Sequence, residues 1–389
     1  MTHEIESTTM DRILQPLIDN GFDGIGDVVQ ALLNSAMLIE REKALGAGAY
    51  ERSDSRDGYA NGFKPRSLKT RVGKLELSVP QVRGSSAPFY PSVLERGQRN
   101  ERALLLSLTE MYVQGVSTRK VSKIVERMCG FEVSSEQVSR ACAEMDTALD
   151  KWRKRPIGCV KALIFDAFYE NVRVDGAVVS CAVLVAIGIL ENGCRSVLGV
   201  SVSLSEAEVH WRQFIQGLKE RGMHGVEFIV SDDHSGLKAA LRSTLSGVAW
   251  QRCQFHLQQN AQSYVTKKDM KSDVAADIRD IFNAPSLKEA QRLLNLTVEK
   301  YAKTQSNLSA WMEDNLPEGF TVFMLPPEAR KRLRTSNAAE NLHRQIRRRT
   351  KVAGLFPNEN SLLRLVSAIL SEISDEWETG KVYLNVKDI

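Results

Sequence analysis

The segment that decides the fold is Val160-Lys-Ala-Leu-Ile-Phe-Asp-Ala-Phe-Tyr-Glu-Asn-Val-Arg-Val174. Its alternating apolar side chains predict a β-strand with Asp166 near the middle. Asp175-Gly176 is a hairpin turn signal, so the apolar run 177–190 is expected to return as a second strand. An acid in the middle of such a strand needs a reason, because a buried unpaired charge is costly.

The next hundred residues continue a regular order of elements. We expect a third strand at 194–203 and a helix opened by a capping box of Ser205 and Glu208. A buried strand at 226–230 ends at Ser231-Asp232-Asp233, and a helix at 234–245 and a strand at 248–253 follow. A three-stranded meander followed by helix, strand, helix and strand is the order of an RNase H-like core. The predicted fold class is therefore α/β, with a mixed sheet.

Three acids in this order predict a metal-dependent active site. Asp166 lies mid-strand, and Asp232 lies at the carboxyl end of a strand, where open α/β sheets bind ligands. Glu340 would be the third ligand, on a later helix. Such a cage holds two divalent ions about 3.5–4 Å apart, and few all-oxygen ligands favour Mg²⁺, with Mn²⁺ tolerated.

Each acid also has a simpler interpretation. Asp166 could be a strand-edge acid, Asp232 a helix cap, and Glu340 a member of a surface ion pair. Asp233 is a rival to Asp232, but we expect it to cap the helix that begins at His234.

The helix that contains Glu340 is strongly basic. Residues 330–351 hold nine Lys or Arg and this single acid. Positions three, four and seven apart share a helix face, so His343, Arg344 and Arg347 should point with Glu340. We expect Arg344, Arg347 and Arg348 to contact DNA phosphates. A solvated helix with an i,i+4 Glu–Arg pair is the alternative.

The amino-terminal part predicts DNA binding. Residues 47–98 form a Gly-, Ser-, Arg- and Pro-rich segment with short strands and little core, suited to phosphate contacts or to a plain linker. Helices predicted at 103–112, 117–128 and 134–145, the last two capped by Ser117 and Ser135, follow a helix-turn-helix pattern. Its candidate DNA-binding residues are Arg119, Gln137 and Arg140.

The expected organisation has six regions. They are an N-terminal helical region (1–46), a basic segment (47–98), a helix-turn-helix domain (99–155), the first part of the core (156–254), an α-helical insertion (255–330) and the C-terminal core helices with Glu340 (331–389). The insertion begins beside Cys253 and His256. This Cys-x-x-His pair could be half a zinc site, but no second pair with suitable spacing follows, so zinc is not expected.

Composition excludes several classes of protein. The chain is 43% hydrophobic and 26% charged with a net charge of +4, as in ordinary globular proteins. Six cysteines are scattered without a CxxC pair, which favours a reducing compartment. The N-terminus has no signal-peptide pattern, and the apolar run 178–190 is too short to span a bilayer. We therefore expect a cytoplasmic protein without membrane association.

Several ordered motifs resemble one family across nearly the whole chain, the insertion sequence 256 group of Mutator-type bacterial DDE transposases. The motifs are Asp57-Gly-Tyr-Ala-Asn-Gly-Phe-Lys64, Met111-Tyr-Val-Gln-Gly-Val-Ser-Thr-Arg119, Ser231-Asp-Asp-His-Ser-Gly-Leu-Lys238, Gln251-Arg-Cys-Gln-Phe-His256 and Asn337-Ala-Ala-Glu-Asn-Leu-His-Arg-Gln-Ile-Arg-Arg-Arg-Thr-Lys351. The chain departs from the family's usual first catalytic motif at Phe168, where a smaller apolar residue is common.

This resemblance implies an RNase H-like catalytic domain with a helical insertion. It gives Asp166, Asp232 and Glu340 the catalytic places, and Cys253 with His256 the family's Cys-x-x-His signature. The implied function is binding of terminal inverted repeats and metal-dependent DNA cleavage and strand transfer, by a homodimer or higher oligomer acting on double-stranded DNA. The alternatives are a DNA-binding regulator or inactive transposase derivative, and an RNase H-fold nuclease without strand transfer.

Overall fold

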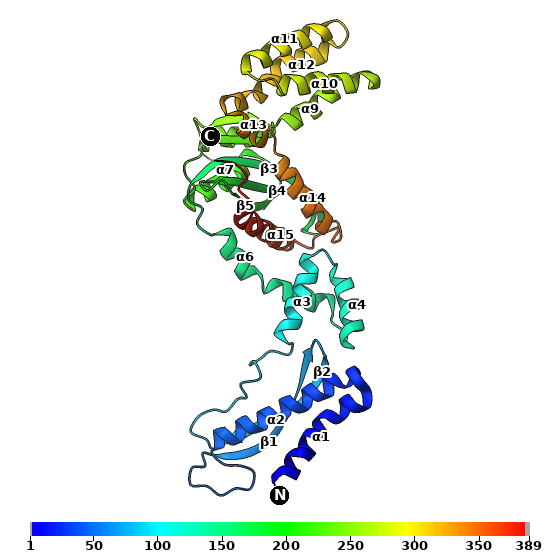
Figure 1. Ribbon diagram of the computed structural model, residues 1–389, viewed down its shortest axis with the longest axis vertical. Helices are drawn as coiled ribbons and strands as arrows, with labels where there is room; N and C mark the ends of the chain where they lie inside the picture. The colour runs from blue at the N-terminus through cyan, green and yellow to red at the C-terminus, as the bar shows by residue number, and fades with distance from the viewer. Residues whose placement is uncertain (1, 386–389) are drawn as a thin grey trace. The chain divides into compact units, whose positions relative to one another are not determined.

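The chain divides into two compact units between Glu144 and Met145 (Figure 1). The structure is a computed structural model that describes residues 2–385. Residue 1 and residues 386–389, the ends of the first and last predicted regions, lie outside the described residues. The six predicted regions are a finer division than these two units.

The first unit begins with two helices and a long β-hairpin. They are α1 (Thr2–Asn20), the short 3-10 helix η1 (Gly21–Gly24), α2 (Ile25–Leu45), β1 (Tyr59–Thr70) and β2 (Gly73–Arg83). Leu75, Leu77 and Val79 point to one face of β2 and pack with Met37 of α2 and Leu94. The expectation of short strands with little core was therefore wrong, because alternate residues of β2 build a small core on α2.

Three short helices complete this unit: α3 (Arg102–Val113), α4 (Thr118–Cys129) and α5 (Ser135–Ala143). Ser117 caps α4 as predicted, by accepting a hydrogen bond from the Lys120 amide. The cap of α5 is Ser134 and not Ser135. Ser134 forms a capping box with Gln137, so the glutamine three residues on selects the cap position.

The second unit is built on a five-stranded sheet in the order β5-β4-β3-β6-β7. The strands are β3 (Val160–Val174), β4 (Ala177–Leu190), β5 (Arg195–Ser203), β6 (Phe228–Ser231) and β7 (Ala249–Arg252). The first three pair antiparallel, whereas β6 and β7 run parallel to β3. The predicted α/β class and mixed sheet are thus confirmed.

Helices cover both faces of this sheet. On one face, Leu163 and Phe165 of β3 pack against Trp211 of α7 (Glu208–Glu220) and Leu237 of α8 (Ser235–Thr244). Alternation along β3 therefore turns Asp166 to the other face. There α14 (Asn337–Thr350) and α15 (Glu359–Thr379) contact β3.

Two predicted helix caps in this unit were wrong. The N-cap of α7 is Ala207, so Ser205 and Glu208 form no capping box there. The N-cap of α8 is His234, and Asp233 does not cap it. Instead, Asp233 forms ion pairs with Lys238 and with the buried Arg252. The ion pairs with Lys238 and Arg252 therefore determine where this carboxylate lies, and it is not used as a helix cap.

The helical insertion joins the sheet after β7. It contains α9 (Gln254–Ser263), η2 (Lys268–Met270), α10 (Lys271–Phe282), α11 (Leu287–Ala302), α12 (Ser306–Asn315), η3 (Leu316–Gly319), η4 (Thr321–Met324) and α13 (Pro327–Leu333). Glu318 of η3 binds Lys238 and Arg252 of the core, and Gln251 accepts a hydrogen bond from the Val322 amide.

The helix α6 (Asp146–Arg153) packs on α15 through an ion pair between Asp146 and Arg364.

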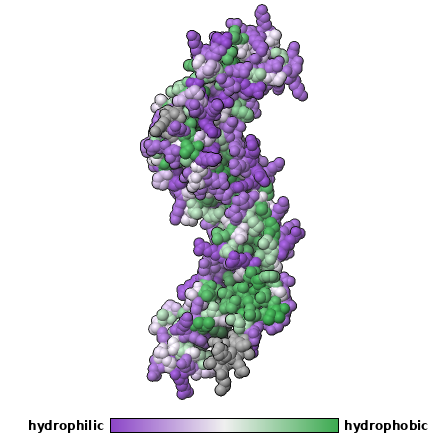
Figure 2. Space-filling view, in the orientation of Figure 1, coloured by the Kyte–Doolittle hydropathy of each residue, from purple (hydrophilic) through white to green (hydrophobic). Residues whose placement is uncertain are grey.

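Apolar side chains gather on the surface of the first unit (Figure 2). Exposed examples on α1, η1 and α2 are Leu14, Ile18, Phe22, Leu32 and Ile39. None of the described helices is long and apolar enough to cross a membrane.

Gly236 permits a close approach between α8 and the loop before α7. A Cβ at this position would lie 2.2 Å from the Glu206 carbonyl oxygen. We expect Gly236→Ala to destabilise the second unit by about 1–3 kcal/mol, as overpacking does. The matched control is Gly217→Ala in α7, where a Cβ meets nothing within 4 Å, and which should stabilise by roughly 0.5–1 kcal/mol. Thermal denaturation of both variants checks this, and equal melting temperatures would contradict it.

Candidate active site

Asp166 and Asp232 come together through the register of two parallel strands. Ala162, Leu163 and Ile164 of β3 pair with Phe228, Ile229 and Val230 of β6. Asp166 and Asp232 each lie two residues beyond the last of these pairs, Ile164 and Val230. Since paired strands lie about 4.8 Å apart, this register brings the two carboxylates to neighbouring positions.

Asp166 is a buried carboxylate in a negative environment. The residue is 7% exposed, and its Oδ1 accepts the Ala167 amide at 3.0 Å. Burial, and then the Asp232 charge, raise the pKa of Asp166 to about 7, and Glu340 adds to the rise. His256 and the Ala167 amide oppose this effect. Further positive charge beside Asp166 would favour its ionised form.

The helix α14 brings Glu340 to these aspartates. Glu340 lies in the first turn of α14, where the helix dipole favours a negative charge. The start of this helix is fixed by Ser336, whose backbone amide and hydroxyl donate to Cys253 Sγ at 3.3 and 3.2 Å. Both Ser336 and Cys253 are fully buried. The Cys-x-x-His motif thus anchors the helix that carries the third acid.

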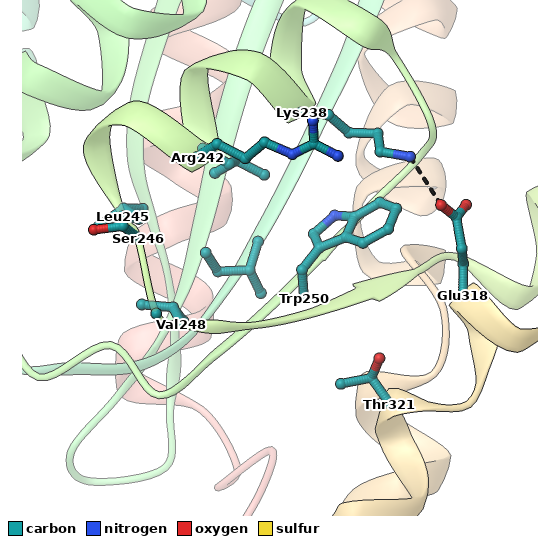
Figure 3. Close-up of a pocket in the computed structure, with 11 residues that line it drawn as sticks. Lys238, Arg242, Leu245, Ser246, Val248, Trp250, Glu318 and Thr321 are labelled. Atoms are coloured by element: carbon teal, nitrogen blue, oxygen red, sulfur yellow. Dashed lines mark hydrogen bonds and ion pairs between the residues drawn. The ribbon is translucent and has the colours of Figure 1, made fainter.

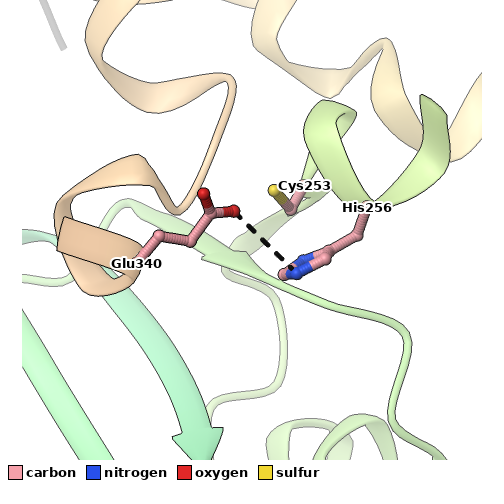
Figure 4. A group of neighbouring side chains, drawn as sticks. All are labelled: Cys253, His256 and Glu340. Atoms are coloured by element: carbon pink, nitrogen blue, oxygen red, sulfur yellow. Dashed lines mark ion pairs between the residues drawn. The ribbon is translucent and has the colours of Figure 1, made fainter. Parts of the chain in front are cut away.

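Cys253, His256 and Glu340 form a cluster in which their ligand atoms all lie within 4.8 Å of one another (Figure 4). Glu340 Oε1 is 4.0 Å from His256 Nε2. The neighbouring Cys253 side chain raises the pKa of His256 to about 9, despite the burial of the imidazole. Burial would raise the pKa of the Cys253 thiol, but the hydrogen bond and charge of His256 lower it below its ordinary value. Cysteine and histidine therefore tend toward a thiolate–imidazolium pair.

His343, one turn beyond Glu340, covers Asp166. Its Nδ1 is 3.6 Å from Asp166 Oδ2, and its ring packs on Phe168 with 4.6 Å between centroids. Burial, and then Arg347, lower the pKa of His343 to about 4. His343 is therefore neutral at pH 7, so its contact with Asp166 is not an ion pair. Phe168, the departure from the family pattern, supports this imidazole.

Sequence reasoning missed a fourth acid near this site. The Glu206 side chain, in the loop after β5, is 10% exposed and its Oε2 is 3.9 Å from His234 Nδ1. Burial raises the pKa of Glu206; His234 opposes the rise and Asp232 adds to it. The only sequence signal was an acid directly after a strand, which is too common to single it out.

The basic residues of α14 differ in their contacts. Arg344, Arg347 and Arg348 are exposed. Arg349 is half-buried and pairs with Glu372 of α15 at 3.0 Å. The i,i+4 pair between Glu340 and Arg344, the alternative interpretation of this helix, is not among the ion pairs of the described residues. Instead, Glu340 Oε1 is buried and has no hydrogen-bond partner there.

The predicted DNA-binding residues of the first unit lie on its short helices. Arg119 is exposed in the first turn of α4, and Arg140 is exposed on α5, where it pairs with Glu136 at 3.4 Å. Gln137 uses its side-chain oxygen to accept the Ser134 amide in the capping box. Its side-chain nitrogen is not used by that bond.

A cavity of about 490 Å³ lies between α8, β7 and the insertion (Figure 3). Trp250 and Lys238 line it, with the Lys238 amine 4.7 Å from the ring centroid. Asp166, Asp232 and Glu340 do not line this cavity. The catalytic candidates therefore do not depend on it.

The donor set of the acids fits a hard divalent cation. Asp166, Asp232 and Glu340 offer carboxylate oxygens, which Mg²⁺ prefers. The raised pKa of Asp166 and the unpartnered oxygen of Glu340 are two signs of negative charge that the described residues do not balance.

Comparisons with known proteins agree with the motifs. The profile described as "Transposase, Mutator family" matches residues 1–380. The transposase for insertion sequence element IS406 of Burkholderia multivorans is 51% identical over 387 residues, which are 99% of each chain. The transposase for IS256 in transposon Tn4001 of Staphylococcus aureus is 37% identical over 92% of each chain.

A solved intasome of simian T-cell lymphotropic virus, in complex with a PP2A regulatory subunit, is similar to 53% of this chain and 66% of its own chain. At 9% identity and a TM-score of 0.19, this likeness carries no argument. The resemblance predicted from the motifs is nevertheless confirmed by the profile and by the full-length relatives. The chain belongs to the Mutator family of transposases.

Proposed function

We propose that this chain is a DDE transposase that binds the terminal inverted repeats of its insertion sequence and catalyses metal-dependent DNA strand cleavage and strand transfer. The observation that carries the proposal is the β3–β6 register, which aligns Asp166 with Asp232, together with the effect of Glu340, from a distant segment, on the pKa of Asp166. The strand order β5-β4-β3-β6-β7 supports an RNase H-like core. The full-length relatives named as transposases support the reaction class.

Asp166, Asp232 and Glu340 would hold two Mg²⁺ ions, with Mn²⁺ as a substitute. Bound there, such ions would supply activation of the attacking oxygen and stabilisation of the leaving oxygen of a phosphodiester. Asp166 must be ionised for this role, and its pKa of about 7 makes that ionisation sensitive to the charge beside it. His343 stays neutral and excludes water from one side of Asp166.

The exposed arginines of α14 would bind the DNA backbone beside the acids. Guanidinium groups match phosphate oxygens with forked hydrogen bonds. Arg347 is close enough to lower the pKa of His343, which in turn contacts Asp166. Arg344 and Arg348 extend the same basic surface along the helix.

Recognition of the DNA ends is proposed for the first unit. Helices α3 to α5 would act as a helix-turn-helix, with Arg119 and Arg140 near the duplex and Gln137 reading through its amide nitrogen. Basic side chains of the hairpin β1–β2 would follow phosphates. The exposed apolar side chains of α1 and α2 support assembly as a homodimer or higher oligomer. The proposed place of action is the bacterial cytoplasm.

Two other functions are weaker. A DNA-binding regulator or inactive derivative would have no need to keep three acids together and one glutamate oxygen unpartnered. A nuclease of the same fold would cleave without joining, and only the products distinguish it. A strand-transfer assay with terminal-repeat DNA and a plasmid target therefore tests the proposal, and cleavage without joined products would favour the nuclease.

The three acids are expected to be needed for chemistry and not for DNA binding. Asp166→Asn, Asp232→Asn and Glu340→Gln should each reduce cleavage roughly 10³-fold or more while terminal-repeat binding is kept. The control is Glu227→Gln. The Glu227 carboxylate pairs with Lys161 at 2.5 Å and lies just before Phe228, where β6 begins, whereas Asp232 follows the other end of this strand. Near-normal cleavage by any of the three variants in Mg²⁺ would remove that residue from the site.

Stabilisation by Mg²⁺ is expected to depend on pH through Asp166. The metal-free protein should lose stability as pH rises from about 4 to about 7, since this raised pKa makes ionisation costly when folded. Mg²⁺ binds the ionised form, so its apparent affinity should fall about fivefold from pH 7 to pH 6. Melting temperatures with Mg²⁺, at matched ionic strength, should rise more at pH 8 than at pH 6. Asp166→Asn should lose this pH dependence, and an unchanged dependence would contradict the assignment.

Arg347 is expected to act in cleavage and not in folding. Arg347→Ala should lower the cleavage rate roughly 10- to 100-fold, as loss of a charge-stabilising donor does, with an unchanged melting temperature. Arg347→Lys should restore part of the rate, because it keeps the charge and loses the fork. The matched control is Arg349→Ala, which breaks the pair with Glu372 and should cost at most about 1 kcal/mol of stability. A melting temperature that falls with activity in Arg347→Ala would assign this residue to the fold.

A further inference from the structure

We infer that Cys253, His256 and Glu340 form a second metal site, selective for a thiophilic divalent ion such as Zn²⁺, which competes with the hard-metal site for Glu340. The three donors are a thiol sulfur, an imidazole nitrogen and a carboxylate oxygen, whose ligand atoms all lie within 4.8 Å of one another (Figure 4). One sulfur, one nitrogen and one oxygen suit Zn²⁺, which accepts all three, and do not suit Mg²⁺.

The distances require only a small closure. Zinc bonds of about 2.0–2.3 Å in a tetrahedral site place the ligand atoms roughly 3.3–3.8 Å apart. The separation of 4.0 Å between His256 Nε2 and Glu340 Oε1 is close to this range. Rotation of the Glu340 side chain, which is 27% exposed, can supply the difference. A fourth position would remain for water.

The surroundings of the sulfur are those of a metal thiolate. The backbone amide and the hydroxyl of Ser336 both donate to Cys253 Sγ. Hydrogen bonds of this kind orient metal ligands from outside the first coordination sphere. Glu340 Oε1, the oxygen that faces His256 Nε2, is buried without a hydrogen-bond partner in the described part of the chain. The cluster therefore holds an unpaired carboxylate oxygen that can bind a cation.

Pairs of cysteine and histidine along the chain do not complete a zinc site. The third ligand comes instead from α14, which returns to α9 after the whole insertion. Because Glu340 lies far from Cys253 and His256 in the sequence, the spacing of possible zinc ligands along the chain does not reveal it.

The consequence for activity rests on the proposed function. Glu340 cannot serve both ions with the same oxygen, so a thiophilic ion at Cys253 would draw this carboxylate from the hard-metal site. Low concentrations of Zn²⁺ would then inhibit DNA cleavage even in the presence of excess Mg²⁺. Removal of the sulfur would relieve the inhibition without removing any of the three proposed catalytic acids.

Metal binding to the full-length, metal-free protein tests the site without any DNA. The probe is Co²⁺, whose thiolate complexes absorb in the near ultraviolet, followed by displacement with Zn²⁺. We expect a thiolate absorption band that saturates at one Co²⁺ per chain, and loss of this band when Zn²⁺ displaces the Co²⁺. Cys253→Ser should abolish the band and weaken Zn²⁺ binding on the order of 100-fold or more, since even second-sphere changes cost 10- to 100-fold.

Two further variants keep the test decisive if Cys253→Ser folds poorly. Glu340→Gln should keep the thiolate band but weaken Zn²⁺ affinity at least tenfold. Cys159→Ser is the matched control. Cys159 precedes β3 and is seven residues from Asp166, roughly 23 Å along an extended strand. Its substitution should leave Co²⁺ and Zn²⁺ binding unchanged. A thiolate band that survives Cys253→Ser, or Zn²⁺ affinity equal in wild type and Glu340→Gln, would overturn the inference.

Cleavage assays then separate this inference from the proposed function. If wild-type cleavage is inhibited by micromolar Zn²⁺ and Cys253→Ser is resistant, the competition for Glu340 is supported. Resistance of the wild type, at Zn²⁺ concentrations that saturate the Co²⁺-detected site, would overturn the competition. Absence of cleavage in Mg²⁺ alone would count against the proposed function, while the binding result would still decide the zinc site.

Discussion

The parallel pairing of β3 with β6 is the constraint on which the candidate site depends. Its register aligns Ile164 with Val230, and so aligns Asp166 with Asp232 two residues further along each strand. Two carboxylates at neighbouring positions on paired strands repel each other, and burial strengthens the effect. Burial, and then the charge of Asp232, raise the pKa of Asp166 to about 7. The apolar packing of β3 and β6 on α7 and α8 holds the acids together against this repulsion.

A second constraint brings the third acid to the same place. The insertion separates Glu340 from the sheet along the chain, so local geometry alone cannot position it. Cys253 at the end of β7 accepts two hydrogen bonds from Ser336, and the Gln254 amide donates to the Arg334 carbonyl. Arg252, one residue earlier, binds Asp233 and Glu318. The same short segment therefore links β6, the insertion and α14.

The sequence predicted the elements that depend on local pattern. Strands 160–174 and 177–190 have the predicted bounds, because alternation and the Asp-Gly turn are local signals. It failed where a side chain has a distant partner: Asp233 was assigned to a helix cap, yet Arg252 and Lys238 bind it. Asp166 and Asp232, expected to be neighbours from the order of elements, follow aligned positions of β3 and β6. The closeness of Cys253, His256 and Glu340 could not be predicted, because the loop that closes it spans the entire insertion.

Charge balance links the site to the basic helix that carries it. Asp166, Asp232, Glu206 and Glu340 concentrate negative charge, and the described cations nearest to Asp166 and Glu340 include His256, whose pKa of about 9 keeps it charged at neutral pH. One imidazolium balances only part of this charge. The remainder would repel a phosphate backbone unless cations were bound, and the exposed arginines of α14 sit on the same helix to attract that backbone. An acidic centre on an arginine-rich helix therefore agrees with the proposed binding of both divalent ions and a polyanion.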